Sequence, residues 1–523
     1  MAEQPNHNRA LSLLHQARNN PDSIAIAYEG TSITFAALAE HVCATAGALR
    51  ALGVEQGCRV GVMIPSEPEF IFVHLALQLL GATVSPLNIF YRPGELAHAI
   101  ATCALDTVVL HATLMDRLPA PVRAEAASLR RAILCGTRTP HQGFTLLDPA
   151  RDTSEPVHTP ALVAASDIAM LLNTSATTGK SKGVMLTAAN LAANYDRTPH
   201  WLGLGAEDVI LCALPLYNTF GLNQCINAML VTGAKLVLLP RFDAGRCIEA
   251  IQSQGCSFMP TVPTMLQKIV DHPDLQPGAL HSLRTILTGG APVPGPLLQR
   301  VLAASSPQAK VLTGYGLTEA TALVTVCSVT CNAQGDIDRG KTIGQVLEGM
   351  ALEVMDDDGT LLPRGASGEL VLRGPNVMAG YFNAPDDTSQ ALQFGWLHTG
   401  DIGTIDAEGY AYILDRKKDV IIRGGQNIYP ADIEEVIYAI DGVVEVAVVA
   451  REDEMLGEVP VAFVALRPGS SVSASTIMAR CEETLASYKR PGAVHILADL
   501  PKGPTGKILR RALRDQLLAR ITP

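Results

Sequence analysis

The stretch 173–183 reads NTSATTGKSKG and directly follows the apolar run 168–172. It combines small residues, hydroxyl side chains and two lysines, a composition typical of loops that bind phosphate through backbone N–H groups, hydroxyls and positive charge. The P-loop motif G-x-x-x-x-G-K-[ST] matches only at its end, because Thr174 stands where the first glycine is required. A loop of this composition is also a common turn. Whether residues 173–183 form a phosphate-binding loop or a simple turn therefore has to be decided from motifs elsewhere in the chain.

Length, composition and charge restrict the class of protein. With 523 residues the chain is too long to fold around a single hydrophobic core, so two or more domains are expected. Its 48% of apolar residues is enough for a large core in each of them. The net charge of −11 argues against nucleic acid as the main partner. The eleven cysteines lack metal-ligand spacing and are expected to be reduced, buried thiols of a cytoplasmic protein.

The sequence predicts neither a signal segment nor a transmembrane segment. The first ten residues, MAEQPNHNRA, contain no apolar run. Two long uncharged stretches, 70–91 and 209–234, are interrupted by proline, glycine or asparagine. Because hydrocarbon penalises such polar and backbone-breaking residues, both stretches are expected to be buried core.

Apolar runs rich in β-branched residues alternate with helical patterns along most of the chain. Such runs occur at 59–64, 107–110, 209–214 and 235–239. This alternation is typical of parallel strands covered by helices. It predicts an α/β fold with a large N-terminal domain of helix-covered, mostly parallel sheets.

The pattern changes after about residue 416. An amphipathic helix is predicted from 431, strands at 443–450 and 459–466, and further helices at about 475–487 and at the basic C-terminal end. These elements predict a small C-terminal α+β domain. We therefore expect domains at 1–416 and 417–523, joined by an exposed hinge at the charged tract DRKKD.

Four more motifs carry side chains suited to nucleotide chemistry. In LTGYGLTE, residues 312–319, a Glu beside a Thr supplies oxygen ligands for Mg²⁺. In WLHTGD, residues 396–401, an Asp after a turn can accept hydrogen bonds from both ribose hydroxyls. The tract DRKKD is followed by RGGQNIYP at 423–430, and PKGPTGK at 501–507 is a rigid loop that presents one lysine. Taken singly, these acids and lysines are equally typical of turns, helix starts and solvated tails.

In this order the five motifs resemble the adenylate-forming superfamily, which includes acyl- and aryl-CoA synthetases, adenylation domains of peptide synthetases and firefly luciferase. The resemblance covers nearly the whole chain, and RGGQNIYP is most similar to the acyl-CoA synthetases. It identifies 173–183 as the superfamily's phosphate loop, T-S-G-T-T-G-x-P-K-G, and makes the P-loop match accidental. It implies a ligase that uses ATP, Mg²⁺ and coenzyme A.

The resemblance also implies a role for each matching residue. The residues implied for the β- and γ-phosphates are Thr174, Ser175, Thr177, Thr178, Gly179 and Lys182. Those implied for adenine and ribose are Gly290, Ala291, Tyr315, Asp401 and Arg416. Those implied for catalysis are Thr318 and Glu319, at the α-phosphate and Mg²⁺, and Lys507, the lysine of adenylate formation. Lys418 matches the hinge position, and Gly424 and Gly425 match the glycines that line the pantetheine tunnel.

The acyl pocket implied by the resemblance is lined by residues that are mostly small or apolar. Its residues are Asn218, Phe220, Gly289, Gly290, Thr313, Gly314, Ala322 and Leu323. The set contains no Arg or Lys for a second carboxylate and no Asp for an amino group. It therefore favours a fatty or other apolar monocarboxylic acid and a role in fatty acid metabolism, with an aryl acid as an open alternative.

Three positions depart from the superfamily pattern. Ala176 stands where glycine is usual, Ser181 where proline is usual, and Asn218 where many relatives have histidine. None of them removes a group that the chemistry needs.

The expected reaction has two steps: adenylation of the acid with release of pyrophosphate, then transfer to CoA with release of AMP. Two alternatives stay open: transfer to an acyl carrier protein, and a degenerate, non-catalytic binding protein. We expect a cytoplasmic monomer or homodimer whose partners are small molecules.

Overall fold

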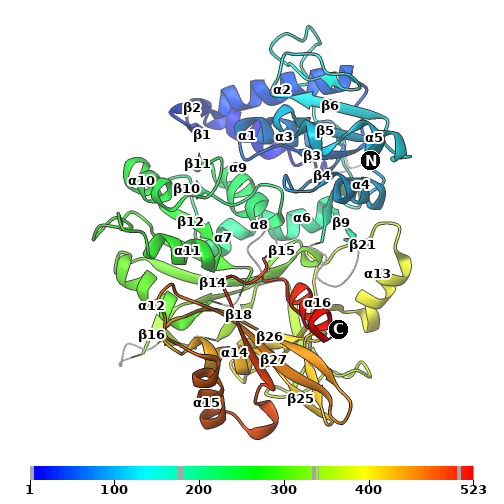
Figure 1. Cartoon of the computed structure of the whole chain (residues 1–523). Coiled ribbons are helices and arrows are strands. Elements are labelled where there is room, and N and C mark those ends of the chain that lie inside the picture. The colour runs from blue at the N-terminus through cyan, green and yellow to red at the C-terminus, as the bar shows by residue number, and fades with distance from the viewer. Residues whose placement is uncertain are drawn as a thin grey trace. The chain divides into compact units, whose positions relative to one another are not determined.

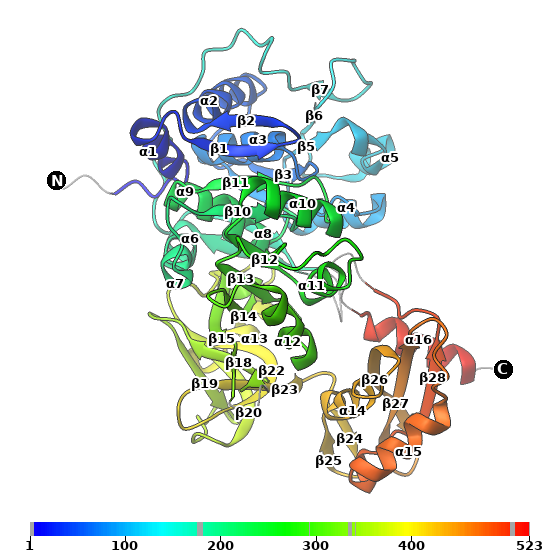
Figure 2. The same cartoon turned by 90° about the vertical axis from the view of Figure 1, so that its left-hand side faces the viewer.

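The computed structural model describes residues 5–174, 181–291, 293–332, 337–339, 341–502 and 508–521, the last six by their backbone only. The described chain divides into two compact units (Figures 1 and 2). The first comprises 5–351 and 372–397, and the second comprises 352–371 and 398–521. The expected domain boundary after residue 416 stays a prediction.

The first unit contains a sheet of eight strands in the order β21-β9-β8-β4-β3-β5-β6-β7. Strands β8, β4, β3, β5, β6 and β7 are parallel, whereas β9 is antiparallel to β8 and to β21. The bounds are β21 Gly380–Tyr381, β9 Gly183–Thr187, β8 Ile168–Asn173, β4 Thr83–Pro86, β3 Arg59–Met63, β5 Thr107–His111, β6 Arg131–Cys135 and β7 Thr145–Leu146.

A second sheet of the same unit has the order β18-β15-β14-β13-β12-β10-β11-β1-β2. Its central strands, from β14 to β1, are parallel. The bounds are β18 Thr342–Val346, β15 Ala322–Ser328, β14 Lys310–Leu317, β13 Thr285–Gly289, β12 Phe258–Thr261, β10 Val209–Cys212, β11 Lys235–Leu238, β1 Ile24–Tyr28 and β2 Thr31–Thr34. In open parallel sheets, ligands bind beyond the carboxyl ends of the strands, where the predicted pocket residues of β13 and β14 lie.

Helices cover these sheets with their apolar faces. Helices α10, α11 and α12 pack one such face against β10–β14 (Figure 2), and α4 packs against the strands around β5. The helix bounds are α1 Leu11–Asn19, α2 Phe35–Ala51, α3 Pro68–Leu79, α4 Pro93–Thr102, α5 Ala120–Glu125, α6 Ala188–Tyr195, α7 Thr198–Leu202, α8 Thr219–Gly221, α9 Ala228–Thr232, α10 Ala244–Gln254, α11 Pro263–Val270, α12 Gly295–Ala304 and α13 Pro385–Ala391. The predicted helix-covered, mostly parallel α/β domain is confirmed, and the uncharged stretches form buried parts of it.

The second unit contains two groups of strands. Strands β19, β20, β22 and β23 are neighbours in that order, and a further sheet has the order β25-β24-β27-β26, with β28 beside β27. The bounds are β19 Ala351–Met355, β20 Ser367–Arg373, β22 Leu397–Ile405, β23 Ala411–Arg416, β24 Ile421–Arg423, β25 Gln426–Ile428, β26 Val443–Asp453, β27 Gly457–Leu466 and β28 Ala493–Leu497.

The sheet around β26 is covered on both faces. Helices α14 (Pro430–Tyr438) and α15 (Ala474–Thr484) share an apolar cluster with Val448, whereas Leu513 of α16 (Arg510–Ile521) shares one with Val449. Successive residues of a strand point to opposite faces, so the continuous apolar run of β26 serves both clusters. This confirms the smaller C-terminal α+β domain.

Candidate active site

The predicted phosphate loop lies between two antiparallel strands. Asn173 at the end of β8 pairs with Gly183 at the start of β9. Just inside this pair, the Thr174 N–H donates to the Lys182 carbonyl at 3.0 Å, and the Lys182 N–H donates to Thr174 Oγ1 at 3.1 Å. A helix follows a P-loop, whereas Gly183 here begins a strand, which favours the superfamily's phosphate loop over a P-loop.

The remaining loop residues of the prediction lie outside the described residues. They are Ser175, Ala176, Thr177, Thr178 and Gly179. The base of the loop is described, and Ser181 Oγ donates to the Thr174 carbonyl at 2.7 Å. Ser181, which stands where proline is usual, therefore helps to close the loop.

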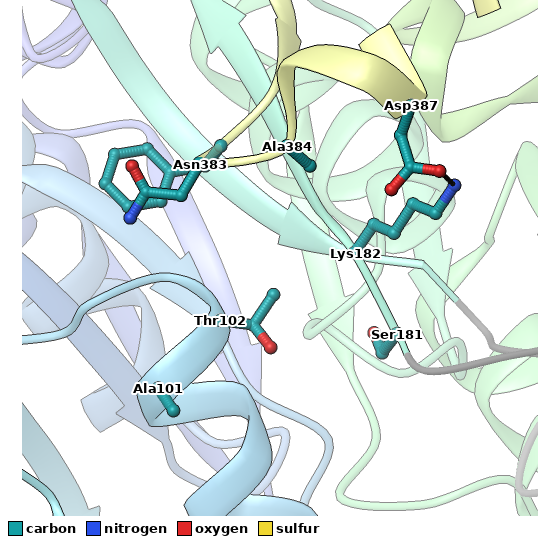
Figure 3. Close-up of a pocket in the computed structure, with 8 residues that line it drawn as sticks. Ala101, Thr102, Ser181, Lys182, Asn383, Ala384 and Asp387 are labelled. Carbon is teal, nitrogen blue, oxygen red and sulfur yellow. Dashed lines mark hydrogen bonds and ion pairs between the residues drawn. The ribbon is translucent and has the colours of Figure 1, made fainter. Parts of the chain in front are cut away.

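The loop lysine contacts an acid that the sequence did not reveal. Lys182 Nζ lies 2.5 Å from Asp387 Oδ1 (Figure 3). It also lies 4.9 Å from the ring centre of Tyr381. Lys182 and Asp387 border a cavity of about 400 Å³, together with Thr102 of α4 and Asn383. Because both members of the ion pair are more than a third exposed, the pair is open to exchange with a phosphate group.

Glu319 is held by Tyr381. The short helix η3 (Thr318–Ala320) follows β14 directly, and the Tyr381 hydroxyl donates to Glu319 Oε1 at 3.0 Å. Burial and the negative charge of Glu319 raise the pKa of Tyr381 above its ordinary value, so the hydroxyl stays protonated and continues to donate. Thr318 precedes Glu319 in the same turn, as predicted.

The residues around Glu319 fit the demands of Mg²⁺. This ion is usually held by one or two carboxylates together with substrate phosphates, rather than by a cage of protein ligands. The described part of the chain contains no cluster of three or more His, Cys, Asp or Glu side chains that could hold a metal alone. A single oriented carboxylate at Glu319 is therefore a suitable donor set for a nucleotide-bound ion.

Most of the predicted acyl and adenine residues lie on three neighbouring strands. Gly289 pairs with Gly314 across β13 and β14, and Ala322 and Leu323 lie on β15 beside β14. A Cβ at Gly289 would lie 2.3 Å from the Gly314 carbonyl oxygen, so close strand packing by itself requires glycine there. Gly290 follows with φ +79°. The structure thus gives these glycines a packing role beside the predicted one.

Asn218 and Phe220 occupy the segment that leads into α8. Asn218 Oδ1 accepts the Gly221 N–H at 2.9 Å and so caps this short helix. Phe220 is partly buried against the apolar cluster of α10–α12. Thr219 Oγ1 donates to the Thr321 carbonyl at 2.7 Å, which brings this segment next to the start of β15.

The second unit brings the two predicted ribose residues together. Asp401 on β22 is directly opposite Arg416 on β23, and Arg416 Nε lies 2.7 Å from Asp401 Oδ1. The side chain of Asp401 is 3% exposed and that of Arg416 is 47% exposed. The buried carboxylate is therefore oriented by a partner that still reaches solvent.

The hinge tract is less exposed than predicted. Asp415 and Asp419 are buried, and both lie close to Arg510 of α16. Arg416, Lys417 and Lys418 between them are exposed. The expectation of an exposed hinge holds for the three basic residues and is wrong for the two acids, because Asp415 and Asp419 find a partner about ninety residues later in the chain.

Gly424 and Gly425 form the turn of a tight hairpin. They connect β24 to β25 with φ values of +56° and +80°. Positive φ at both central residues is typical of a type I′ turn, which favours glycine for backbone reasons alone. A Cβ at either position would meet nothing within 4 Å, so the turn lies open to its surroundings.

Lys507 lies outside the described residues. The segment that carries it begins and ends at residues that are described: Lys502 and Ile508 form an isolated β-bridge, and the Leu509 N–H donates to the Pro501 carbonyl at 2.8 Å. Thr313 and Tyr315 lie on β14, and Ala291 follows the end of β13 by two residues.

Sequence reasoning missed three residues at or beside these sites: Tyr381, Asp387 and Arg510. The first two belong to the stretch 380–388, in which Gly380, Asn383 and Pro385 indicate only turns and a helix start. No local pattern connects either residue with Glu319 or Lys182.

Among the described residues, no helix is both long and apolar enough to cross a bilayer.

Comparison with known proteins identifies the family. The model of the AMP-binding enzymes matches residues 13–382, and that of the AMP-binding enzyme C-terminal domain matches residues 432–507. The chain therefore belongs to the AMP-binding enzyme family, which confirms the resemblance to adenylate-forming enzymes.

Similarity extends over nearly the whole chain. A feruloyl-CoA synthase of Amycolatopsis sp. is 34% identical, with 96% of this chain and 97% of that protein covered. A long-chain-fatty-acid–CoA ligase of Bacillus subtilis is 31% identical, with 98% and 95% covered. The structure of O-succinylbenzoate-CoA synthetase from Bacillus subtilis in complex with ATP and magnesium ion is 29% identical, with a TM-score of 0.83 and with 97% and 99% covered.

The fold, the site and these relatives define the activity class. The chain is an acyl- or aryl-CoA ligase that works through an adenylate and uses ATP, Mg²⁺ and CoA.

Proposed function

We propose that this ligase activates a fatty acid or another apolar monocarboxylic acid and transfers the acyl group to CoA. The observation that carries the choice of substrate is the composition of the predicted acyl residues on β13, β14 and β15. None of them is charged, and Ala322 and Leu323 are buried. A second carboxylate or an amino group on the substrate would lack a partner there, and an unpaired buried charge is costly.

In the proposed adenylation step, the acid's carboxylate attacks the α-phosphorus of ATP and pyrophosphate leaves. Thr174 and Lys182 bind the phosphates, with Lys182 exchanging Asp387 for a phosphate oxygen. Asp401 and Arg416 bind the ribose. Lys507 carries positive charge to the oxygens on which negative charge develops. Bound at Glu319 and Thr318, Mg²⁺ supplies further neutralisation of phosphate charge.

In the proposed second step, the thiol of CoA attacks the carbonyl of the acyl-adenylate and AMP leaves. The thiol sulfur forms the new bond to carbon as the bond to the AMP phosphate oxygen breaks. The Gly424–Gly425 turn forms part of the wall of the pantetheine tunnel. The two steps use opposite faces of the small domain, which turns about Lys418 between them.

An aryl acid is the second candidate. The feruloyl-CoA synthase relative favours it, whereas the long-chain-fatty-acid–CoA ligase relative favours the first candidate. A flat aromatic acid and an alkyl chain both satisfy an uncharged pocket. The pocket composition therefore supports a monocarboxylic acid of either kind against a dicarboxylic or amino acid.

The test is a panel of acids incubated with ATP, Mg²⁺ and hydroxylamine, which traps the adenylate as a hydroxamate. We expect hydroxamate from alkyl or aryl monocarboxylic acids and little from dicarboxylic or amino acids of similar length. Preference for a dicarboxylic or amino acid would overturn the proposed substrate class. Free CoA and an acyl carrier protein, supplied separately with the preferred acid, then identify the acceptor.

A further inference from the structure

The chain forms a narrow neck before the C-terminal helix. Lys502 and Ile508 pair across this neck, and the Leu509 N–H closes it on the Pro501 carbonyl at 2.8 Å. Lys507 belongs to the five residues between the two sides of the neck. The described residues on either side of this segment are held by separate groups of side chains.

The first side of the neck is held by Lys502. Its ammonium nitrogen lies 2.8 Å from Glu445 Oε2 on β26 and also pairs with Asp499. The side chains of Lys502 and Glu445 are 28% and 21% exposed. This side is thus attached to the central sheet of the small domain.

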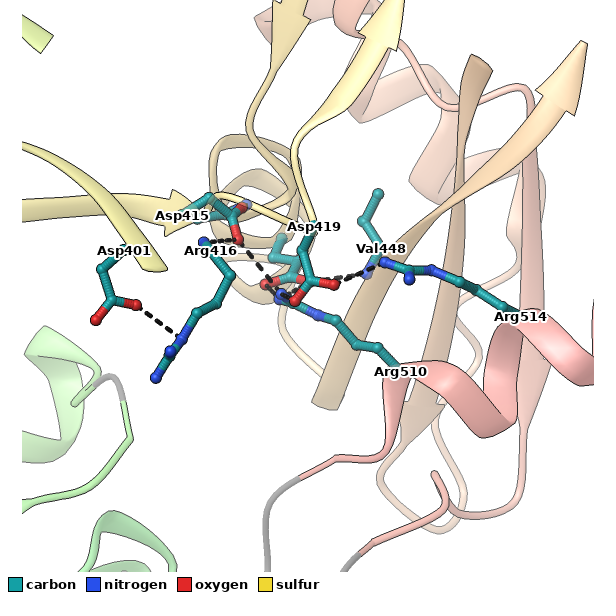
Figure 4. Close-up of polar contacts among 9 residues, drawn as sticks. Asp401, Asp415, Arg416, Asp419, Val448, Arg510 and Arg514 are labelled. Atoms are coloured by element: carbon teal, nitrogen blue, oxygen red, sulfur yellow. Dashed lines mark hydrogen bonds and ion pairs between the residues drawn. The ribbon is translucent and has the colours of Figure 1, made fainter. Parts of the chain in front are cut away.

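The second side is held by Arg510, the first residue of α16. Its guanidinium nitrogen Nη2 donates to both carboxylate oxygens of Glu434, at 2.7 and 2.8 Å (Figure 4). The other terminal nitrogen, Nη1, lies 3.4 Å from Asp415 Oδ1 and 3.3 Å from Asp419 Oδ2. One guanidinium therefore joins α16 to α14 and to both ends of the hinge tract.

The three carboxylates are themselves held in place. Asp415 Oδ2 accepts the Ala431 N–H at 3.0 Å, and Glu434 Oε1 accepts the Val448 N–H at 2.7 Å. Arg514, one helical turn after Arg510, pairs with Asp419 at 2.7 Å. Burial lowers the pKa of Arg510, but the surrounding carboxylates outweigh this and hold it above its ordinary value. The guanidinium stays charged, and its planar fork sets both position and direction.

From this geometry we propose that Arg510 is a positioning residue for adenylate formation. It anchors the C-terminal side of the neck, only three residues after Lys507, and the action of Lys507 depends on this anchor. The inference rests on the proposed role of Lys507. Because the same guanidinium holds Asp415 and Asp419 on either side of Lys418, the neck and the hinge tract form one connected body. A lysine at position 510 would keep the positive charge but lose the planar set of N–H donors of the guanidinium. Misplacement of a catalytic group by about 1 Å is enough to slow a reaction about 10²-fold.

The test compares Arg510→Lys, Glu434→Gln and Lys507→Ala in the two half-reactions. Arg511→Gln is the matched control, because Arg511 is exposed and makes no ion pair within the described part of the chain. Pyrophosphate exchange measures adenylation, and synthetic acyl-adenylate with CoA measures thioester formation. We expect Arg510→Lys and Glu434→Gln to lower the kcat of exchange roughly 10- to 100-fold, with an ATP KM within about 3-fold of normal and thioester formation nearly unchanged.

A role that acts through Lys507 also predicts non-additivity. Adding Arg510→Lys to Lys507→Ala should cost less than about 3-fold further in exchange, because the lysine to be positioned is already gone. An equal loss of both half-reactions by Arg510→Lys, or a full additional loss in the Lys507→Ala background, would show a general structural role and overturn the proposal. Normal exchange by Lys507→Ala itself would instead overturn the catalytic role of Lys507, and the positioning role with it.

Discussion

Replacing Asp401 tests the nucleotide site most directly. Its side chain is 3% exposed and pairs with Arg416 at 2.7 Å, so it is both buried and oriented. Loss of a charged hydrogen-bonding partner costs about 1.5–3 kcal/mol, which corresponds to about 10- to 150-fold in binding. We expect Asp401→Ala to raise the ATP KM by this factor. Arg416 is 47% exposed and can be solvated after the change, so the loss of folding stability should be only about 1 kcal/mol.

The assay that isolates the ribose contact uses 2′-deoxy-ATP and 3′-deoxy-ATP in pyrophosphate exchange. Wild-type protein should bind at least one of these deoxy analogues more weakly than ATP. Asp401→Ala should discriminate far less between that analogue and ATP, because the carboxylate that accepts the ribose hydroxyl is missing. Asp358→Ala removes an exposed carboxylate of the same unit and serves as the control. If Asp401→Ala keeps the wild-type KM for ATP and the wild-type discrimination, Asp401 does not bind ribose.

Three other changes follow from the geometry. Tyr381→Phe removes the hydroxyl that holds Glu319 and should raise the Mg²⁺ concentration for half-maximal exchange by about 3- to 10-fold; an unchanged titration would separate Glu319 from the metal. Asn218→His should be tolerated, because a histidine can cap a helix in this protein, as His111 does for the 3-10 helix Ala112–Arg117. The variant's activity should gain a dependence on pH near ~6.5, the ordinary pKa of histidine. A pH profile identical to that of the wild type would count against a position near the substrate carboxylate. Burial raises the pKa of Glu67 to about 7, so its contribution to stability is fully present below pH 4.5 and is lost as the pH rises through 7. Glu67→Gln should therefore raise the melting temperature relative to wild type at pH 8, by the equivalent of about 1–3 kcal/mol, and not at pH 4; equal differences at both pH values would refute this.

Much of the fold could be predicted from apolar periodicity. The predicted strands at 443–450 and 459–466 correspond to β26 (Val443–Asp453) and β27 (Gly457–Leu466). The structure extends both strands toward their shared hairpin. The added residues are mostly polar or charged, so they carry no apolar pattern, and their pairing is set by the partner strand rather than by burial. Periodicity therefore located the strands and missed where they end.

The candidate site divides in the same way between local and distant contacts. Thr174 and Lys182 belong to one loop and could be assigned together from one motif. By contrast, Lys182 and Asp387 are 205 residues apart, and Glu319 and Tyr381 are 62 apart. Nothing in the residues around Asp387 differs from an ordinary first turn of a helix, where acids are common because of the helix dipole. Only the tertiary fold shows which acid meets the loop lysine.

The hinge shows why the exposure of charged residues is hard to predict. The tract DRKKD was expected to be exposed because an isolated charge is costly to bury, and that reasoning is correct as long as no partner exists. Arg510 and Arg511 are identical neighbours in the sequence, yet one faces three carboxylates and the other faces solvent. Helical spacing places Arg510 and Arg514 on one face and Arg511 on another, so the face is readable from the sequence. The carboxylates that this face meets are readable only from the fold, because Asp415 and Asp419 precede Arg510 by 95 and 91 residues.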